Sequence, residues 1–341
     1  MPNLPKQQKA VIFDTLANTL SFTSSAPLPV SRDEHLIRVH STSITNGELT
    51  WGPYVNWPAH QVPCYDVSGT ILSRVEDSPF EIGDRIFGRV MANRGGTARQ
   101  FATILPSETA LVPKGLGLVE ASVIPMSALT AWQAIFEKGL LTGEYREGSV
   151  PRVSEGEIVG GDLARGKRVL VLGAAGEWGS MAVQFARLAG AYVVGTASAR
   201  NAEFVSGLGA EIVDYTKLSM REWVGGKEEK KFDLLLDCVG GKAMMDAWGA
   251  VKSNGVYISI APGFREPEEG IPSGVKSEWF VMESRGSELA AIGKFVEKGI
   301  VKGWVDSVWK IEEFEQAFAK TATGHARGKV VIKVAEGEEE R

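Results

Sequence analysis

Three glycines are the residues of this chain whose type and spacing best fit a chemical role. Gly173, Gly176 and Gly179 stand three residues apart, after the apolar run VLVL and at the start of a stretch with helical spacing. In a tight strand-to-helix turn, backbone N–H groups approach a pyrophosphate without obstruction by side chains. We therefore predict a dinucleotide site here, the alternative being a purely structural turn. The predicted contacts include the neighbouring Ala174, Glu177, Trp178 and Thr196.

The end of the next apolar strand predicts which dinucleotide binds. NAD enzymes of this architecture usually hold the ribose hydroxyls with an acidic residue, and none occurs between Gly179 and Asn201. Ser198 and Arg200 stand there instead, and a guanidinium suits a 2′-phosphate through charge-assisted hydrogen bonds. NADPH is therefore the predicted cofactor. A solvated surface cation is the alternative interpretation of Arg200.

Glu177 and Trp178 fit this site less easily. A carboxylate directed at a pyrophosphate would repel it. We expect Glu177 to point to solvent or to the helix N-terminal dipole, where an acid is favourable. Trp178 either lies over the cofactor or packs against another domain.

The sequence shows two different patterns of secondary-structure elements that would position these residues. Residues 9–105 alternate short β-rich runs with polar turns, which predicts an all-β unit. Helical spacing appears before Gly139, and from Lys167 strand and helix patterns alternate, which predicts a parallel sheet with right-handed crossovers. The polar segment from Thr142 to Lys167 is expected to be an exposed loop. The fold class is therefore α/β, with a second β-rich domain.

Composition limits the function further. The chain has 341 residues, enough for two domains, a net charge of -5 and a pI near 5.6. This charge gives no reason to expect nucleic acid or an anionic membrane as a partner. The start lacks a secretory signal and no apolar run reaches the length needed to span a bilayer, so a cytoplasmic protein is expected. Cys64 and Cys238, far apart and without CxxC spacing, predict neither disulfide nor cysteine-rich zinc lobe.

Several segments taken together resemble a known family. They are SITNGELTW, VPCYDVSG, FEIGDRIFG, the region from GGTARQFA to LTAWQAIF, the glycine turn, SGLGAEIVDY, FDLLLDCVGG and ARGKVVIKV. In this order they resemble the zinc-independent quinone oxidoreductase-like and enoyl reductase-like branch of the medium-chain dehydrogenase/reductase superfamily. The resemblance covers nearly the whole chain.

The resemblance implies a GroES-like β-barrel catalytic domain and a Rossmann-fold, doubly wound parallel-sheet domain that binds NADPH. We place the first in residues 1–128 and 266–341 and the second in residues 129–265. Zinc-dependent relatives carry a GHE motif where this chain has Cys64-Tyr65-Asp66, so no metal is predicted. The implied activity is NADPH-dependent reduction, without zinc, of an activated C=C bond (enone or enoyl-type) or of a quinone.

The resemblance also assigns individual residues to the cofactor. It places Asn46 near the nicotinamide, so Asn46 is both a predicted cofactor contact and a catalytic candidate. The other positions that it assigns to the cofactor are Thr130, Tyr215, Val239, Gly240, Ala261, Phe280, Val281 and Lys329.

Tyr54 and Tyr65 are the candidate proton donors, because a phenol could protonate the carbanion left after hydride transfer. Solvent is the third candidate source of the proton. Trp51 and Trp57 beside Tyr54 indicate an aromatic-walled pocket and hence a small hydrophobic or aromatic organic substrate. Two other functions stay open, a non-catalytic NADPH-binding protein and a redox-neutral enzyme. A homodimer is predicted through the strand at residues 255–260.

Overall fold

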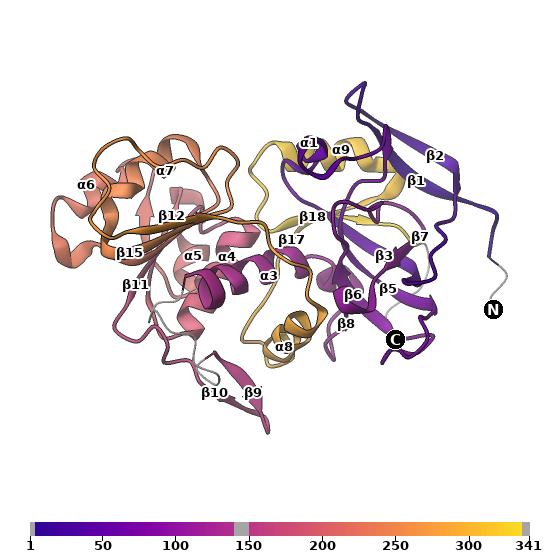
Figure 1. Ribbon diagram of the computed structural model, residues 1–341, viewed down its shortest axis with the longest axis horizontal. Helices are drawn as coiled ribbons and strands as arrows, with labels where there is room; N and C mark the ends of the chain where they lie inside the picture. The colour runs from indigo at the N-terminus through magenta and orange to yellow at the C-terminus, as the bar shows by residue number, and fades with distance from the viewer. Residues whose placement is uncertain (1–3, 140–149, 336–341) are drawn as a thin grey trace. The chain divides into compact units, whose positions relative to one another are not determined.

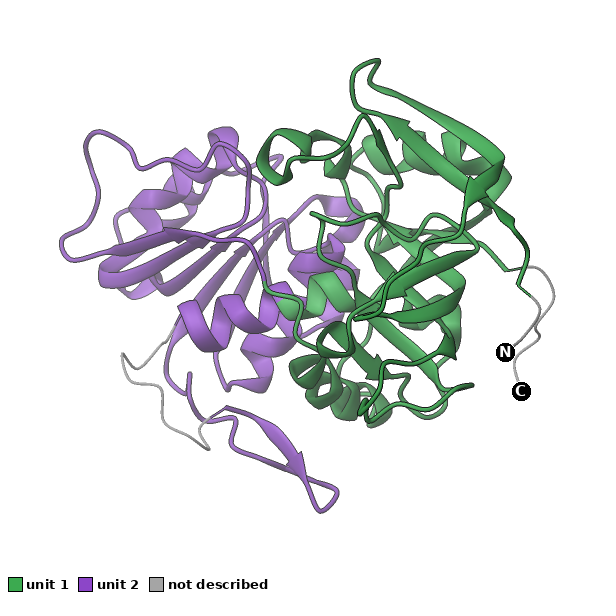
Figure 2. Ribbon diagram, turned by 45° about the vertical axis from the view of Figure 1, so that its right-hand side comes forward, with its two compact units in different colours: residues 1–129, 283–341 green, residues 130–282 purple. Residues whose placement is uncertain are grey.

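The computed structural model describes residues 4–139 and 150–335. The chain divides into two compact units, residues 1–129 with 283–341, and residues 130–282 (Figure 2). The second boundary lies at 282/283 rather than at the predicted 265/266. The reason is that residues 276–279 form a strand that pairs with Val251–Ser259 of the second unit.

Unit 1 is built from both ends of the chain. Its larger sheet has the order β17-β18-β3-β5-β6-β8, with β7 also paired to β3, and a smaller sheet has the order β2-β1-β4. The C-terminal β18 pairs with β3, and Figure 2 shows unit 1 in green. The strands are β1 (Gln7–Asp14), β2 (Thr19–Pro27), β3 (His35–Ile44), β4 (His60–Gln61), β5 (Asp66–Ser73), β6 (Arg85–Arg89), β7 (Phe101–Ile104), β8 (Thr109–Leu111), β17 (Val305–Lys310) and β18 (Lys329–Lys333).

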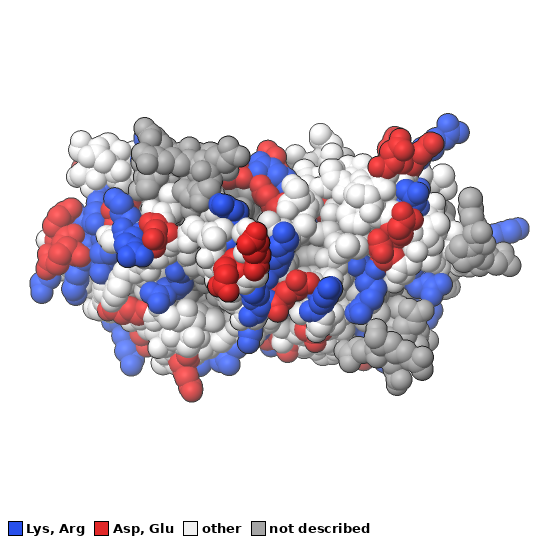
Figure 3. All heavy atoms as spheres, turned by 90° about the horizontal axis from the view of Figure 1, so that it is seen from below, with Lys and Arg blue, Asp and Glu red and all other residues white. Residues whose placement is uncertain are grey.

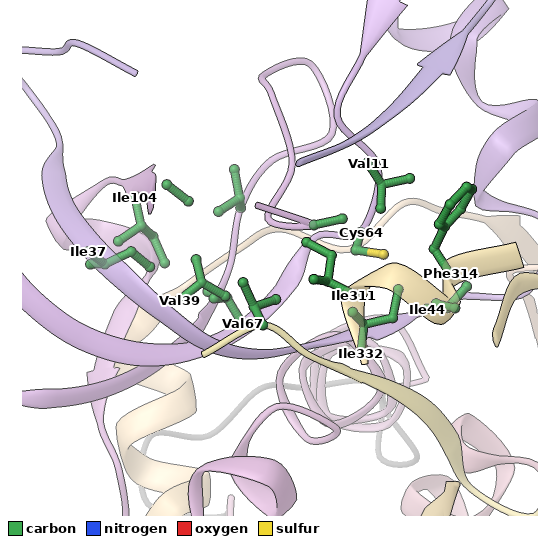
Figure 4. Packing of buried hydrophobic residues seen from close by; sticks show 14 of the residues in the cluster. Val11, Ile37, Val39, Ile44, Cys64, Val67, Ile104, Ile311, Phe314 and Ile332 are labelled. Atoms are coloured by element: carbon green, nitrogen blue, oxygen red, sulfur yellow. The ribbon is translucent and has the colours of Figure 1, made fainter. Parts of the chain in front are cut away.

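Short helices connect and cover these strands. They are η1 (Glu48–Thr50), α1 (Gly52–Val55), η2 (Pro106–Glu108), α2 (Leu118–Ala121), α8 (Gly286–Glu297), η7 (Ile311–Glu313) and α9 (Phe314–Ala322). The core of unit 1 lies between α9 and the sheet, where the apolar faces of alternating strand residues meet (Figure 4). Cys64 belongs to this cluster.

Unit 2 contains the predicted parallel sheet. All its neighbouring strands are parallel, in the order β13-β12-β11-β14-β15-β16. The strands are β11 (Arg168–Leu172), β12 (Tyr192–Ala197), β13 (Glu211–Asp214), β14 (Phe232–Asp237), β15 (Val251–Ser259) and β16 (Lys276–Trp279). The helices are α4 (Glu177–Leu188), η4 (Ala199–Asn201), α5 (Ala202–Gly207), α6 (Met220–Val224), η5 (Glu228–Lys230), α7 (Gly241–Ala247) and η6 (Trp248–Ala250).

The sheet edge differs from the prediction. The strand at residues 255–260, expected at a dimer interface, belongs to β15, which is paired on both sides by β14 and β16. The edge strands of this sheet are β13 and β16. The homodimer stays a prediction, and its expected strand is not an edge.

The predicted loop from Thr142 to Lys167 also differs from the structure. Residues 140–149 lie outside the described residues, and the rest contains a hairpin of β9 (Arg152–Ser154) and β10 (Glu157–Val159). Its turn places Glu155 and Gly156 at φ 49° and 85°, as a two-residue hairpin turn requires. Strands this short have too little periodicity to be seen in the sequence.

One helical stretch meets the length and composition of a membrane span, which the sequence analysis did not expect. It is Leu118–Lys138, formed by α2, α3 (Pro125–Gln133) and the π-helix η3 (Ala134–Lys138), and 83% of its most apolar window is buried inside the protein. A buried apolar helix of this kind is what a protein core requires. On the face that Figure 3 shows, acidic and basic side chains are interspersed.

Candidate functional site

The glycine turn lies at the carboxyl end of β11, in the middle of the parallel sheet. Gly173 has φ 71°, a left-handed conformation that glycine adopts without strain. Its N–H donates to Thr196 Oγ1 at 2.9 Å, and the N–H of Ala174 donates to Thr196 O at 3.0 Å. Thr196 of β12 therefore holds the turn in place, a role that differs from a direct cofactor contact.

The three glycines serve different purposes. A Cβ on Gly179 would lie 2.2 Å from Gly173 O, so only glycine lets α4 approach the turn. A Cβ on Gly176 would meet only Gly173 O, at 3.5 Å, which is ordinary contact. Gly176 is the N-cap of α4, whose first-turn N–H groups lack partners within the helix. Nothing in the packing requires glycine at Gly176, whereas a pyrophosphate close to these N–H groups would.

The carboxyl ends of the six parallel strands bring most of the other predicted cofactor residues to one edge of unit 2. Because the strands are all parallel, these ends meet at the same side of the sheet, where ligands of such folds bind. The residues are Gly173 after β11, Ser198 and Arg200 after β12, Tyr215 after β13, Val239 and Gly240 after β14, Ala261 after β15, and Phe280 and Val281 after β16. Thr130, on α3, is buried outside this row.

Asp237, which the sequence analysis did not single out, shapes this edge. Its fully buried carboxylate accepts hydrogen bonds from Val239 N (2.8 Å) and Gly240 N (2.9 Å) through Oδ1. Ser259 Oγ donates to its Oδ2 at 3.0 Å and accepts from Ala261 N at 3.1 Å. One carboxylate therefore fixes the loops after β14 and β15 together. The signal in the sequence was an acid directly after the apolar run of residues 234–236.

Glu177 and Trp178 are both buried. Glu177, at the first position of α4, is 6% exposed, so the expectation that it could point to solvent is wrong. The helix N-terminal dipole is one favourable surrounding for its charge. The indole Nε1 of Trp178 is buried and has no hydrogen-bond partner among the described residues.

In unit 1, Lys329 lies in a buried polar network. Its ammonium, on β18, donates to Asp66 Oδ2 and, at 3.1 Å, to Thr45 Oγ1. The other oxygen of Asp66 accepts from Met126 N at 2.7 Å. Asn46, next to Thr45, is exposed. The network joins the C-terminal strand to the segment that carries Asn46.

Glu48 extends this network and is 1% exposed. It accepts from Thr45 N at 2.8 Å and from Cys64 N at 2.9 Å, and so clamps two loops that the sequence separates. Burial raises the pKa of Glu48 to about 7, although these hydrogen bonds and the Lys329 charge oppose the rise. Burial likewise raises the pKa of the Cys64 thiol well above its usual range.

The two candidate proton donors have opposite surroundings. Tyr65 is fully buried, with ring centroids 5.7 Å from Trp51 and 6.2 Å from Trp57, and its hydroxyl accepts from Gln61 Nε2 at 3.0 Å. Burial raises its pKa. Tyr54 is 79% exposed on α1. Trp51 and Trp57 therefore lie against Tyr65 and not with Tyr54, and the aromatic-walled pocket stays a prediction.

This donor set does not fit a zinc ion. Among residues 4–139 and 150–335, no group of three or more His, Cys, Asp or Glu is arranged to hold a metal. Asp66 already binds the cationic ammonium of Lys329, and Cys64 packs in the apolar cluster of Figure 4. Glu48, which accepts from Cys64 N, is engaged by backbone N–H groups.

Comparison with known proteins identifies the family. A family model described as "Zinc-binding dehydrogenase" matches residues 208–332. The chain is 41% identical to a "Probable zinc-binding oxidoreductase, mitochondrial" of Arthroderma benhamiae, over 97% of this chain and 98% of that protein. It is 27% identical to the "NAD(P)H oxidoreductase RTN4IP1, mitochondrial" of Danio rerio, over 95% and 90%.

A solved structure shows the same fold. An alcohol dehydrogenase superfamily protein from Novosphingobium aromaticivorans matches with a TM-score of 0.81 and 21% identity, over 96% of this chain and 100% of that one. The chain belongs to the medium-chain dehydrogenase/reductase superfamily, in its quinone oxidoreductase-like branch. The two relatives named above are described as mitochondrial, so the cytoplasmic location of this protein stays a prediction.

Proposed function

We propose that this protein is an NADPH-dependent oxidoreductase that transfers a hydride, without zinc, to an activated C=C bond or to a quinone. The observation that carries the proposal is the open position at Gly176. A side chain there would meet no crowding, so the glycine is explained by a ligand and not by packing. Relatives named as oxidoreductases support an oxidoreductase activity in general.

The preference for NADPH rests on the end of β12. Ser198, the N-cap of η4, is half-buried, and Arg200 is exposed in the same short helix. Both follow the strand beside the glycine turn, where the adenosine ribose of a bound dinucleotide lies in this architecture. A hydroxyl and a guanidinium at this place favour a 2′-phosphate over two free ribose hydroxyls.

The acceptor class follows from the polar atoms of unit 1. Alcohol oxidation in this superfamily needs a Lewis acid, and Asp66, Cys64 and Glu48 do not fit one. Conjugate reduction needs only a hydride donor, hydrogen bonds to the growing oxyanion and a proton. The aromatic stack of Trp51, Tyr65 and Trp57 favours a flat, hydrophobic acceptor.

Titration of the purified protein with NADPH and NADH, followed by cofactor fluorescence, tests the proposal. Wild-type protein should prefer NADPH, and Arg200→Ala should lose about tenfold in NADPH affinity with little change for NADH, as the loss of a charge-assisted contact predicts. Arg165→Ala is the matched control, because Arg165 is an exposed arginine of the same unit, paired with Asp162. Enones and quinones added next should oxidise NADPH. Absence of binding of both cofactors contradicts the proposal.

A non-catalytic NADPH-binding protein is the second candidate, and the buried Glu177 is what favours it. A carboxylate at the start of α4 competes with a pyrophosphate for the same N–H groups. The two functions separate in one experiment. Fluorescence changes without oxidation of NADPH by any enone or quinone would support the binding protein and reject the reductase.

A further inference from the structure

Arg89 is a buried arginine without an acidic partner. It ends β6, and its side chain is 4% exposed. Among the described residues, no carboxylate lies within ion-pair distance of its guanidinium. Burial lowers its pKa, because removal from water disfavours the charged form. A buried charge without a partner is unfavourable, so its presence needs an explanation.

The carboxylates around Arg89 already have other hydrogen-bond or ion-pair partners. Asp66, directly opposite in the β5–β6 register, binds Lys329 and Met126 N. Glu108 binds Arg94 and also accepts from Met91 N. Glu48 accepts from backbone N–H groups, as described above. The protein therefore surrounds Arg89 with negative charge at longer range but leaves its guanidinium without a contact ion.

The free edge of the guanidinium has a defined geometry. Its hydrogen bonds run through Nη1, to Met91 Sδ at 3.1 Å and Ser284 Oγ at 3.2 Å, and a thioether is a weak acceptor. The buried Nε has no hydrogen-bond partner within the described part of the chain. In a planar guanidinium, Nε and Nη2 point the same way along one edge. Two parallel donors of this kind match the two oxygens of a carboxylate.

We propose that the free edge of Arg89 binds a carboxylate of the substrate, so that the natural acceptor is a carboxylate-bearing enone or quinone. Assigning the carboxylate to the acceptor depends on the proposed reductase function. The anion site itself does not, because it needs only Arg89 and its neighbours. Arg89 is then the residue that selects anionic over neutral acceptors.

The surroundings of Arg89 suit such a ligand. Met91 and Ser284, which accept hydrogen bonds from Nη1, are only half-buried. Val90, the next residue, donates its N–H to Tyr65 O, which brings the strand end against the aromatic stack. A flat ligand with a carboxylate at one end therefore finds a charge and an apolar ring wall in adjacent places.

Thermal unfolding of the cofactor-free protein with benzoate and with benzamide tests the site. The two probes share a flat ring and differ in charge, so the wild-type Tm should rise with benzoate and not with benzamide. Arg89→Met should abolish the rise, and Arg89→Lys, which keeps the charge but not the two-donor edge, should weaken benzoate binding about tenfold. Arg85→Met is the control, because Arg85 is exposed on the same strand.

Each outcome decides the proposal. Equal shifts with both probes, a benzoate shift that survives in Arg89→Met, or no shift at about 10 mM benzoate would overturn it. A response to inorganic phosphate in place of benzoate would also overturn it, because the edge would then hold a tetrahedral anion. Failure of NADPH binding, measured separately by fluorescence, would reject the reductase function and leave the anion site standing.

Discussion

Replacement of Gly176 by alanine separates cofactor binding from folding. A Cβ at this position meets only Gly173 O, at 3.5 Å, and Gly176 has φ -72° and ψ 165°, which alanine adopts without strain. The stability change should therefore be within about 1 kcal/mol, the range of N-cap substitutions. The fold should be preserved.

The same methyl group should interfere with the cofactor. A pyrophosphate oxygen hydrogen-bonded to the first N–H groups of α4 would approach Gly176 closely, because such oxygens lie about 3 Å from their donors. Loss of one charge-assisted hydrogen bond costs about 1.5 to 3 kcal/mol, so NADPH affinity should fall at least about tenfold. Fluorescence titration with NADPH measures the affinity, and urea unfolding measures the stability.

Gly207→Ala is the control for this variant. Gly207 lies in α5 of the same unit, and its added Cβ would meet nothing within 4 Å. It should gain about 0.5 to 1 kcal/mol from helix propensity and keep wild-type affinity. If Gly176→Ala binds NADPH within twofold of wild type, the glycine turn is structural and the reasoning about the open position fails.

Three further predictions concern the residues that shape the two units. Gly179→Ala should destabilise unit 2 by about 1 to 3 kcal/mol through its contact with backbone at 2.2 Å, and unchanged urea unfolding would contradict the close approach of α4. Asp237→Ala should cost about 2 to 4 kcal/mol and weaken NADPH binding, because two buried N–H groups lose their acceptor, whereas Ser259→Ala should cost less. For Glu48, a folded-state pKa of about 7 against 4.5 means that the folded protein holds its proton more tightly. The contribution of this group to stability therefore falls as pH rises from 4.5 to about 7. Over that interval the unfolding free energy of wild type, measured relative to that of Glu48→Gln, should fall by about 3 kcal/mol. A difference independent of pH would show that Glu48 ionises normally.

The sequence predicts the cofactor unit well because its signals are local. Apolar strands, amphipathic helices and the glycines at Gly173, Gly176 and Gly179 are all visible within short windows, and the parallel sheet follows from their alternation. β16 was missed because its four residues, KSEW, have no apolar period. Its pairing with β15 is what moves the unit boundary to 282/283.

The polar network of unit 1 was much less visible in the sequence. Lys329 and Asp66 are 263 residues apart, and nothing in either segment indicates that their charges meet. The burial of Glu177 and the isolation of Arg89 likewise depend on side chains packed from distant segments. Sequence periodicity assigns charged residues to the solvent-exposed face of a helix or strand. It therefore cannot identify the charged residues that are buried.

The discontinuous origin of unit 1 has a consequence for biosynthesis. Residues 130–282 form unit 2 as one continuous stretch, so a ribosome releases all of it before the last strand of unit 1 exists. β18 lies between β17 and β3, and it also delivers Lys329 to Asp66. Until residues 329–333 emerge, the nascent chain holds an incomplete sheet with an unneutralised buried acid. The larger sheet of unit 1 is therefore completed only when β18 emerges, after all of unit 2 has been translated.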